Sequence, residues 1–527
     1  MQLLIGSLAM LVTLAASSVL ASDYYVDATN GSDTQGNGSL ENPWRTITFA
    51  LSQVPGPDDT VRVGPGTYDS AHGEVFPLRP APKVSLRSRE GADVTRIAGI
   101  SSVDVLHFPG ADQFNAARPV LDGFEVSGGR DGVVVLADVA GETAILSLLG
   151  NTITGCIRAG CYTAVGLGGN GLIASRNRIH GNGIGLLANK ADGTSVWALS
   201  GNVISANVSH GIQIRDGILS VVSEGDVIRD NGGVGIWQST TSVVQTTLRN
   251  TTVSSNVGGG LYVHADNSGY PNFFDPVCSI GAQHCVVYGN GGFGGTLTAG
   301  SSASRFGQFN SSIAWGNATS DNSSFRALDS NIGSGRRDSG SISVFPAFVE
   351  PGSGDFRLRF DSPCVDAGPF SGFPIDFEGE ARPSDGDSDG ISPVDMGIDE
   401  FHTFVAPGTQ AIAGQPFWFL TQAPPIEDGH LVTVLMSFSR AGENGGVRIP
   451  GSQGRTIDLA PDSLFQFSLR NLPLLQATLA SQQGTTSQCT IPPGVSLPGP
   501  VYYAGVSIDL AQGKIVSITP THSFEVQ

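Results

Sequence analysis

Short apolar segments recur through the middle of the chain at a nearly constant interval. An Ile or Val stands three residues before an Asn in NRIHGN, NVISAN, DVIRDN, TTVSSN and CVVYGN, which place Asn182, Asn207, Asn231, Asn256 and Asn290 at intervals of 25, 24, 25 and 34 residues. NTITGC, ending at Cys156, and SSIAWGN, ending at Asn317, extend the series at both ends. A repeat of strand-sized segments at this period predicts a solenoid, because a single coil cannot bury its apolar face alone.

A second strand follows each of these Asn residues. It opens with Gly and continues with alternating apolar residues, as in GLLA, GIQI, GIWQ and GLYV, which begin at Gly185, Gly211, Gly235 and Gly260. Alternation with period two places neighbouring residues on opposite faces of a strand. The Asn column suits a turn with left-handed backbone, and each amide can hydrogen-bond to its counterpart in the next coil. We therefore assign this column a structural role.

The pattern changes after Phe401. Segments such as FWFLTQA, LVTVLMSFS, LFQFSLRNL and VYYAGVSIDL predict short strands of a small β-sandwich. This domain either binds or sorts the protein at a surface, or only caps the open end of the solenoid. The predicted organisation is a signal peptide at residues 1–21, a parallel β-helix with its cap and closing segment at 22–401, and an accessory domain at 402–527.

Composition agrees with an all-β chain. Only 14% of the residues are charged and 71 of 527 are Gly, which favours short strands and tight turns over exposed helices. The 47 acidic against 28 basic residues give a net charge of -19, which repels nucleic acid and anionic lipid. An anionic polysaccharide would meet the same repulsion unless a local cationic groove or bound calcium overcame it.

The first 21 residues indicate export. An apolar run from Leu3 to Leu14 leads to small residues ending in Val19-Leu20-Ala21, which suits signal peptidase; an uncleaved anchor helix is the alternative. Export would place six cysteines in an oxidising compartment, where Cys156 with Cys161, and Cys278 with Cys285, could close small loops. The alternative is a set of buried free thiols.

Two further stretches carry a resemblance to a known superfamily. YYVDATNGSDTQGNGSLENPWRTITFAL, continuing to DDTVRVGPGTY, resembles the opening module of secreted bacterial β-helix proteins, with a short helix at about 44–53 covering the first coil. Residues 362–401 are similar to the closing segment of β-helix proteins that carry a choice-of-anchor Q domain. Over 23–401 the chain thus resembles the right-handed parallel β-helix, pectin-lyase-like superfamily. This implies the fold but no single activity, because the superfamily holds lyases, hydrolases, epimerases, adhesins and inert proteins.

One column of the second strand is predicted to face outward. It consists of Leu187, Gln213, Trp237 and Tyr262, and the two aromatic residues fall on successive coils about 4.8 Å apart. Exposed aromatic rings on a flat sheet can hold the apolar face of sugar rings. The alternative is an aromatic stack that only stabilises the sheet.

Charged and polar residues gather where the same strand ends. Four residues past the Gly stand Asn189, Arg215, Ser239 and His264, with Lys190, Asp192, Asp216 and Asp266 beside them. The resemblance implies a carbohydrate groove here, with Lys190 or Arg215 as the base of a lyase, His264 as a further catalytic candidate, and Asp216 and Asp266 binding substrate or, with Asp192, calcium. A solvated turn surface with casual ion pairs is the alternative.

The closing segment contains a short acidic motif. Asp385, Asp387 and Asp389 alternate with small residues before Gly390, as in calcium-binding loops, and Asp395 could add a ligand. Met396 occupies the position where an EF-hand has its bidentate Glu, so the motif is not an EF-hand. The motif predicts calcium as a structural clamp, and an acidic turn without metal is the alternative.

Two classes of function remain. We favour a secreted or cell-surface protein that binds polysaccharide or a cell-envelope glycan, since binding needs only the outward column on a long stable scaffold. The alternative is a polysaccharide lyase or glycoside hydrolase, which would need Lys190, Arg215 or His264 within reach of one bound sugar. In either class we expect carbohydrate to contact the face that bears Trp237 and Tyr262 rather than the Asn turn.

Overall fold

The computed structural model describes residues 21–401 with gaps at 55, 57, 113–117, 138, 140, 164–167, 190–193, 266–276, 300–303, 359–361, 370–372, 380–381 and 385–392. Beyond residue 401 it describes little besides the strand segments given below. Within the described residues the chain is nearly all β. The principal helix is α1 (Ile47–Gln53), which begins after the cap Thr46, three residues later than predicted; Ser70–His72 and Pro351–Ser353 form single 3₁₀ turns.

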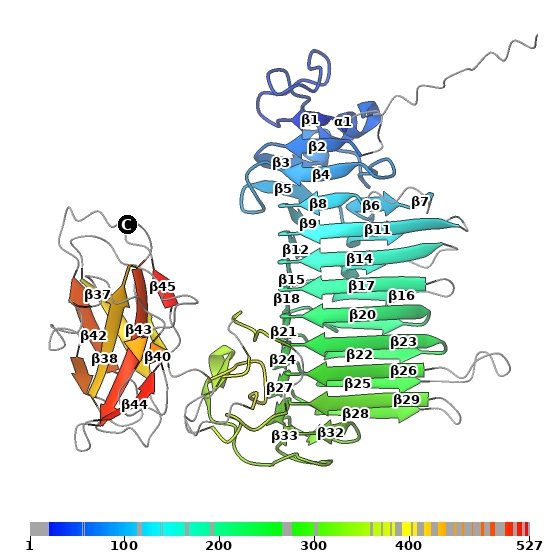
Figure 1. Ribbon diagram of the computed structural model, residues 1–527. Helices are drawn as coiled ribbons and strands as arrows, with labels where there is room; N and C mark the ends of the chain where they lie inside the picture. Colours follow the sequence, from blue (N-terminus) through cyan, green and yellow to red (C-terminus); the bar gives the residue numbers. More distant parts are fainter. Residues whose placement is uncertain are drawn as a thin grey trace, which may run out of the picture.

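Three parallel sheets run side by side along a parallel β-helix, and each complete coil contributes one strand to each sheet (Figure 1). The thirteen-stranded sheet contains β1 (Asp23–Val26), β2 (Thr60–Val63), β4 (Ser85–Ser88), β7 (Ala111–Asp112), β8 (Val120–Asp122), β11 (Glu142–Leu149), β14 (Gly169–Ser175), β17 (Thr194–Ser200), β20 (Ile218–Glu224), β23 (Val243–Arg249), β26 (Val277–Gln283), β29 (Ser304–Asn310) and β32 (Arg326–Leu328). Only the β7–β11 pair in these three sheets is antiparallel within the described strands.

The other two sheets complete each coil. The eleven-stranded sheet contains β3 (Gly66–Asp69), β5 (Thr95–Ala98), β9 (Glu125–Ser127), β12 (Thr152–Thr154), β15 (Arg178–His180), β18 (Val203–Ser205), β21 (Val227–Arg229), β24 (Thr252–Ser254), β27 (Val286–Tyr288), β30 (Ile313–Trp315) and β33 (Asn331–Ile332). The nine-stranded sheet contains β6 (Leu106–Pro109), β10 (Asp131–Leu136), β13 (Ala159–Thr163), β16 (Ile184–Asn189), β19 (Ile212–Arg215), β22 (Val234–Thr240), β25 (Gly259–Ala265), β28 (Phe293–Ala299) and β31 (Ser320–Asn322).

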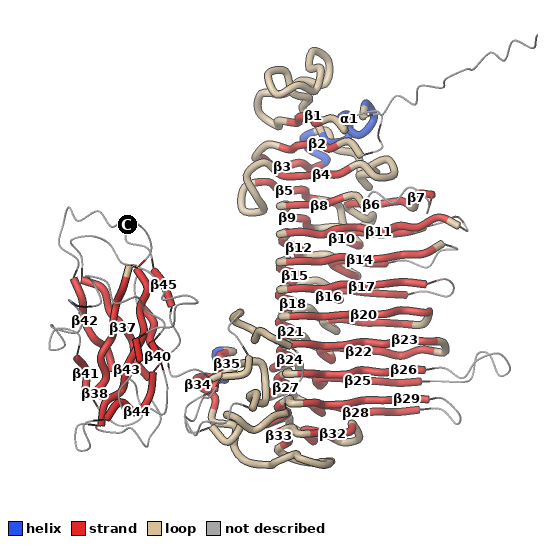
Figure 2. Tube along the Cα trace, in the orientation of Figure 1, coloured by secondary structure: helices blue, strands red, loops and turns tan. Residues whose placement is uncertain are grey.

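The interior of the solenoid is apolar and its columns follow the sequence repeat. Ile204, Ile228, Val253 and Val287 lie in register on β18, β21, β24 and β27 and are fully buried, as predicted. Parallel strands stack these side chains directly on one another, so each coil buries the apolar face of its neighbour. Figure 2 shows the coils stacked in chain order.

The predicted Asn column forms a hydrogen-bonded ladder at the turn between the eleven-stranded and nine-stranded sheets. The Asn231 backbone N–H and Nδ2 both donate to Asn256 Oδ1, at 3.1 and 2.8 Å, and Nδ2 also donates to the Ile204 carbonyl. The prediction that Asn itself takes the left-handed conformation was wrong: the residue before each Asn does so, for example Ala206 at φ 52° and Asp230 at φ 57°. The Asn stays buried because its amide satisfies backbone groups of the preceding coil and donates to the next Asn of the ladder.

A second ladder, which the sequence analysis missed, lies at the turn between the thirteen-stranded and eleven-stranded sheets. Asn151, Asn177, Asn202 and Asp226 follow one another here, each accepting hydrogen bonds from the previous member. Its signal was present in the sequence, because these residues open the same motifs, two positions before the buried Ile. Two ladders therefore fix two of the three corners of the coil.

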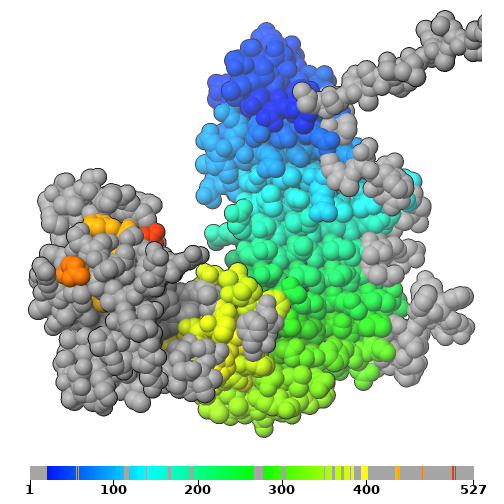
Figure 3. Space-filling model, in the orientation of Figure 1, coloured from blue at the N-terminus to red at the C-terminus, as the bar shows by residue number. Residues whose placement is uncertain are grey.

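The closing segment packs on the side of the last coils, where Figure 3 shows it against the C-terminal half of the solenoid. The hairpin of β34 (Phe348–Glu350) and β35 (Asp355–Leu358) contributes Phe348 and Phe356 to an apolar cluster with Val286 and Ile313 of the solenoid. This segment therefore covers the outer surface of the eleven-stranded sheet at β27 and β30.

Beyond the closing segment, the described strands form small antiparallel sheets, as predicted for a C-terminal β-domain. One contains β36 (Phe404–Pro407), β37 (Pro416–Gln422) and β42 (Thr485–Thr490); another contains β38 (Leu431–Ser437), β41 (Gln476–Thr478), β43 (Val501–Asp509), β44 (Lys514–Ile518) and β45 (His522–Phe524); a third pairs β39 (Val447–Arg448) with β40 (Thr456–Ile457). In the part of the chain that is described, no helix has the length and apolar character needed to cross a bilayer.

Candidate functional site

The outward column of the nine-stranded sheet has the predicted register. Leu187 pairs with Gln213, Gln213 with Trp237, and Trp237 with Tyr262. Leu187 and Gln213 are only 7% and 3% exposed, whereas Trp237 and Tyr262 are half-buried. The accessible part of the column therefore begins at Trp237.

Four rings from successive coils form a continuous row, which we call the aromatic row: His210, Trp237, Tyr262 and Phe293. Adjacent ring centroids lie 5.7, 5.8 and 5.9 Å apart, and the His210–Trp237 and Trp237–Tyr262 pairs are nearly parallel at 21° and 9°. Trp237 and Tyr262 share one column and stack because parallel strands are about 4.8 Å apart, and His210 and Phe293 extend the stack from other register positions in their coils. Both faces of Trp237 are thus covered by neighbouring rings, so its edge rather than its face meets solvent.

The first ring of the row has a structural role. His210 is half-buried, and its Nδ1 accepts a hydrogen bond from the Val234 backbone N–H at 2.9 Å. Burial, and then the charge of Arg215, lower the pKa of His210. His210 is therefore neutral near pH 7 and holds the turn before β22.

Polar groups flank the aromatic row at the strand ends. The guanidinium of Arg215 lies 5.7 Å from the Trp237 ring centroid, and with the Gln213 amide oxygen facing it, Arg215 donates to that oxygen at 3.0 and 2.9 Å. Thr298 Oγ1 donates to Tyr262 Oη at 2.9 Å and lies 2.8 Å from His264 Nδ1. Gln213 therefore positions Arg215 instead of facing solvent, and Thr298 joins Tyr262 to His264.

Of the predicted catalytic residues, Arg215 and His264 are described and they are not brought together. Arg215 pairs with Ser239 and Ser239 with His264, so the two lie two strands apart, roughly 10 Å at the spacing of parallel strands. Asp216 adopts a left-handed turn and accepts hydrogen bonds from the Thr241 N–H and hydroxyl. Lys190, Asp192 and Asp266 lie outside the described residues.

A family model described as a protein of unknown function (DUF1565) matches residues 29–269, and no curated protein matches the chain. Among solved structures, pectate lyase Pel9A is similar at 16% identity over 72% of this chain and 96% of that chain, with a TM-score of 0.49. The parallel pairing of its own strands shows that the chain is a parallel β-helix.

Two other solved structures are similar to this chain. The A-module of mannuronan C-5 epimerase AlgE6 from Azotobacter vinelandii is 15% identical over 57% of this chain and 93% of that one, with a TM-score of 0.32. The enzymatically active domain of tailspike protein 2 from bacteriophage CBA120 is 11% identical over 91% of this chain and 73% of that one, with a TM-score of 0.34. Since all three TM-scores are below 0.5, the architecture of this β-helix rests on its own strand pairing.

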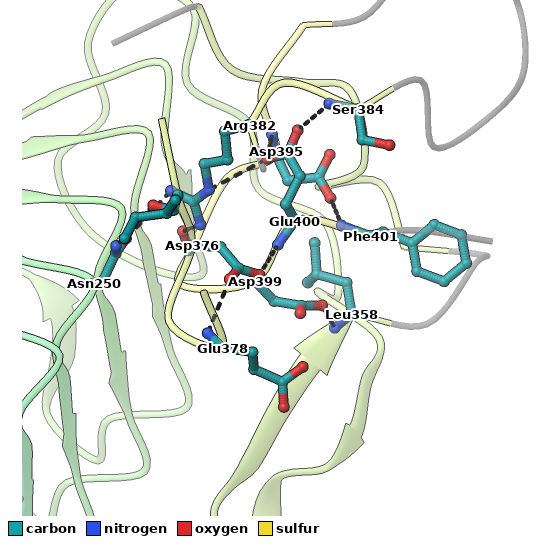
Figure 4. A network of polar contacts seen from close by, with 12 residues as sticks. Asn250, Leu358, Asp376, Glu378, Arg382, Ser384, Asp395, Asp399, Glu400 and Phe401 are labelled. Carbon is teal, nitrogen blue, oxygen red and sulfur yellow. Dashed lines mark hydrogen bonds and ion pairs between the residues drawn. The ribbon is translucent and has the colours of Figure 1, made fainter. Parts of the chain in front are cut away.

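The closing segment of this β-helix holds a buried polar network (Figure 4). Arg382 lies 3.3 Å from Glu400 and donates to Asn250 Oδ1 of the solenoid at 3.3 Å. Asp395 is fully buried, and its two carboxylate oxygens accept hydrogen bonds from the backbone N–H groups of Asp366 and Phe401. Burial and the neighbouring Glu400 raise the pKa of Asp395. The network ties the closing segment to the second ladder corner through Asn250.

The predicted calcium ligands Asp385, Asp387 and Asp389 lie outside the described residues, so among them only Asp395 can be placed. Within the described residues, no three His, Cys, Asp or Glu side chains are arranged as a metal site. Calcium at this motif therefore stays a prediction.

The described cysteines are free thiols. Cys156, Cys161, Cys278, Cys285 and Cys364 are buried and unpaired. Burial raises the pKa of the Cys278 thiol to about 12, so it stays protonated at neutral pH. The alternative in which these cysteines pack as small apolar groups is the one that the structure adopts.

Proposed function

We propose that this β-helix is exported and binds polysaccharide along the nine-stranded sheet, at the aromatic row and its flanking polar groups. The observation that supports the proposal is a continuous series of side-chain contacts on three neighbouring coils, from Arg215 to Trp237, Tyr262 and His264, which leaves these groups partly exposed. Sugar hydroxyls would meet ring edges, the guanidinium and the Tyr262–Thr298–His264 hydrogen bonds. The long, evenly spaced row suits a polymer better than a small compact ligand.

Binding is favoured over catalysis by the spacing of the candidate groups. A general acid or base must lie within hydrogen-bonding reach of the proton it transfers. Arg215 and His264 have separate partners on strands roughly 10 Å apart, which suits contacts to different sugar residues. Among the described strands of the nine-stranded sheet, no outward carboxylate pair of the glycosidase kind accompanies them.

We expect the double substitution Trp237→Ala, Tyr262→Ala to weaken glycan binding at least tenfold, which corresponds to about 1.4 kcal/mol. The measurement is calorimetric titration with the best ligand from a polysaccharide panel, while absorbance at 235 nm monitors release of unsaturated uronates. Because the rings pack on one another, the double variant will also have a lower melting temperature. Tyr262→Phe is therefore measured as a second, less disruptive variant, since it keeps the ring stack and removes only the hydroxyl.

Phe306→Ala is the matched control for the loss of an exposed aromatic ring. Phe306 is 45% exposed on the thirteen-stranded sheet, away from the aromatic row. Its substitution should leave affinity within twofold. Equal glycan affinity of wild type, the folded double variant and Tyr262→Phe would show that the aromatic row serves packing alone. A rise in absorbance at 235 nm would show that the protein is a lyase.

We also propose that Asp385, Asp387, Asp389 and Asp395 bind calcium and clamp the closing segment. Asp395 is buried beside Glu400, and a divalent cation would offset the repulsion between such carboxylates. Added calcium should raise the melting temperature by several degrees and EDTA should reverse it. Asp230→Asn, which removes an exposed carboxylate elsewhere, should keep this response, whereas Asp387→Asn should abolish it. An unchanged melting temperature with calcium and with EDTA would reject the clamp.

A further inference from the structure

The last coil of the solenoid is incomplete at one corner. In the described residues, β31 pairs with β28 only at Phe293 and Gly295, and β32 pairs with β29 only from Gln308 to Asn310. The end of β28 and the start of β29 therefore have no strand stacked beyond them, although the preceding coils are paired along these positions. The missing strand sections leave a notch at the C-terminal end of the nine-stranded sheet.

The notch is a cavity of about 540 Å³ lined by Leu297, Ser304, Arg305, Ser324 and Arg336. Arg305 occupies a column whose earlier members, Val244 and Cys278, are fully buried core residues. An arginine at such a position is compatible with the fold only because the last coil leaves that column open to solvent. The volume lies within the range of pockets that bind small ligands.

The notch is cationic in a protein whose net charge is -19. Arg305 is exposed and forms no ion pair with any described residue. Arg336 forms an ion pair with Asp338 at 3.1 Å and donates a hydrogen bond to the Ser324 carbonyl at 3.3 Å. These two contacts hold the Arg336 guanidinium at the wall of the notch. The two guanidinium groups and the two hydroxyl groups offer several donors to one anionic group.

The notch adjoins the aromatic row. Tyr262 pairs with Thr296, and the Ser323 hydroxyl donates to Thr296 Oγ1 at 2.7 Å, directly before the lining residue Ser324. The lining residue Leu297 precedes Thr298, which contacts Tyr262 and His264. A polymer lying along the row would thus reach the notch beyond Tyr262.

We propose that the notch binds the anionic group, carboxylate or sulfate, of an acidic sugar residue, so that the polysaccharide on the aromatic row is an acidic one. This inference rests on the proposed function. The overall negative charge disfavours every polyanion at long range, so binding one requires local cations that are not neutralised within the protein. Arg305 supplies such a cation at one end of the row, and Arg215 supplies another near its start. Arg336 is paired with Asp338 and contributes hydrogen-bond donors beside Arg305.

The test compares three probes by calorimetric titration of the full chain: tetragalacturonate, a sulfated galactan tetrasaccharide and neutral cellotetraose. An acidic probe should bind at least tenfold more tightly than the neutral one, and raising the salt from 0.05 to 0.5 M should weaken only the acidic probe. The preferred acidic probe identifies the anionic group as carboxylate or sulfate. Arg305→Gln and Arg336→Gln should each weaken its binding about tenfold, while Arg305→Lys should retain part of the affinity.

Arg337→Gln is the matched control, because it removes the same charge from an exposed neighbour that does not line the notch. Its affinity should stay within twofold of wild type. If neutral and acidic probes bind equally, or if the folded notch variants bind as wild type while only melting earlier, Arg305 and Arg336 merely cap the solenoid and the inference is overturned, although binding at the aromatic row stands. If none of the probes or panel glycans binds, both proposals fail.

Discussion

Gly211→Ala is expected to lower the free energy of unfolding of the solenoid by about 3 kcal/mol. A Cβ at Gly211 would lie 2.7 Å from Ile228 Cγ2, 2.8 Å from the Gly235 carbonyl and 2.9 Å from Asn231 Nδ2. The carbonyl belongs to the next coil and the amide belongs to the Asn ladder, so neither can move without breaking hydrogen bonds. Gly185 and Gly235 face the same contacts in their own coils, which explains why Gly recurs at the start of the strands that these coils contribute to the nine-stranded sheet.

The measurement is thermal and urea unfolding of the full chain, followed by far-UV circular dichroism. Gly281→Ala is the matched control: Gly281 lies within β26, and an added Cβ there would meet nothing within 4 Å. Its effect should stay within about 0.5 kcal/mol of wild type. Equal melting of the two variants would contradict the idea that the ladder corner excludes a side chain.

Asp226→Asn is expected to stabilise the solenoid at pH 7 by up to about 3 kcal/mol. Asp226 is the one carboxylate in the second ladder, where the Asn202 N–H and Nδ2 donate to its Oδ1 and the Ser223 hydroxyl donates to its Oδ2. Burial nevertheless raises its pKa from 3.8 to about 6. An asparagine keeps the acceptor for Asn202, and its amide can donate to the Ser223 hydroxyl in place of the present bond.

The sign of the pH dependence follows from the raised pKa. Well below pH 3.8 Asp226 is protonated in both folded and unfolded chains, so burial has no ionic cost. As the pH rises from about 4 to about 6, the unfolded chain loses this proton first, and the wild-type solenoid loses stability. Melting temperatures of wild type and Asp226→Asn should therefore converge near pH 4 and separate by pH 7. The control Asp230→Asn alters an exposed carboxylate in the same coil and should not change this slope; a constant difference at all pH values would refute the assignment.

The repeat itself could be predicted from the sequence because a parallel β-helix is a one-dimensional stack. Each coil contacts only its neighbours, so a column such as Ile204, Ile228, Val253 is visible as a period in the chain. The same reasoning placed Gln213, Trp237 and Tyr262 in one outward column and Arg215 in another with His264. Asp226 escaped notice because it replaces Asn at one position, although it opens the same motif as Asn202.

Other features were decided only by the tertiary structure. The orientation of the aromatic rings cannot be read from the sequence. Trp237 stacks between His210 and Tyr262 because the spacing of the strands leaves too little room for its ring faces to be exposed to solvent. The notch around Arg305 and Arg336 depends on where the last coil stops pairing, which involves residues that are not part of the repeat. Periodicity therefore determines what is stacked, whereas the end of the stack, where contacts no longer repeat, is set by long-range packing that no local pattern encodes.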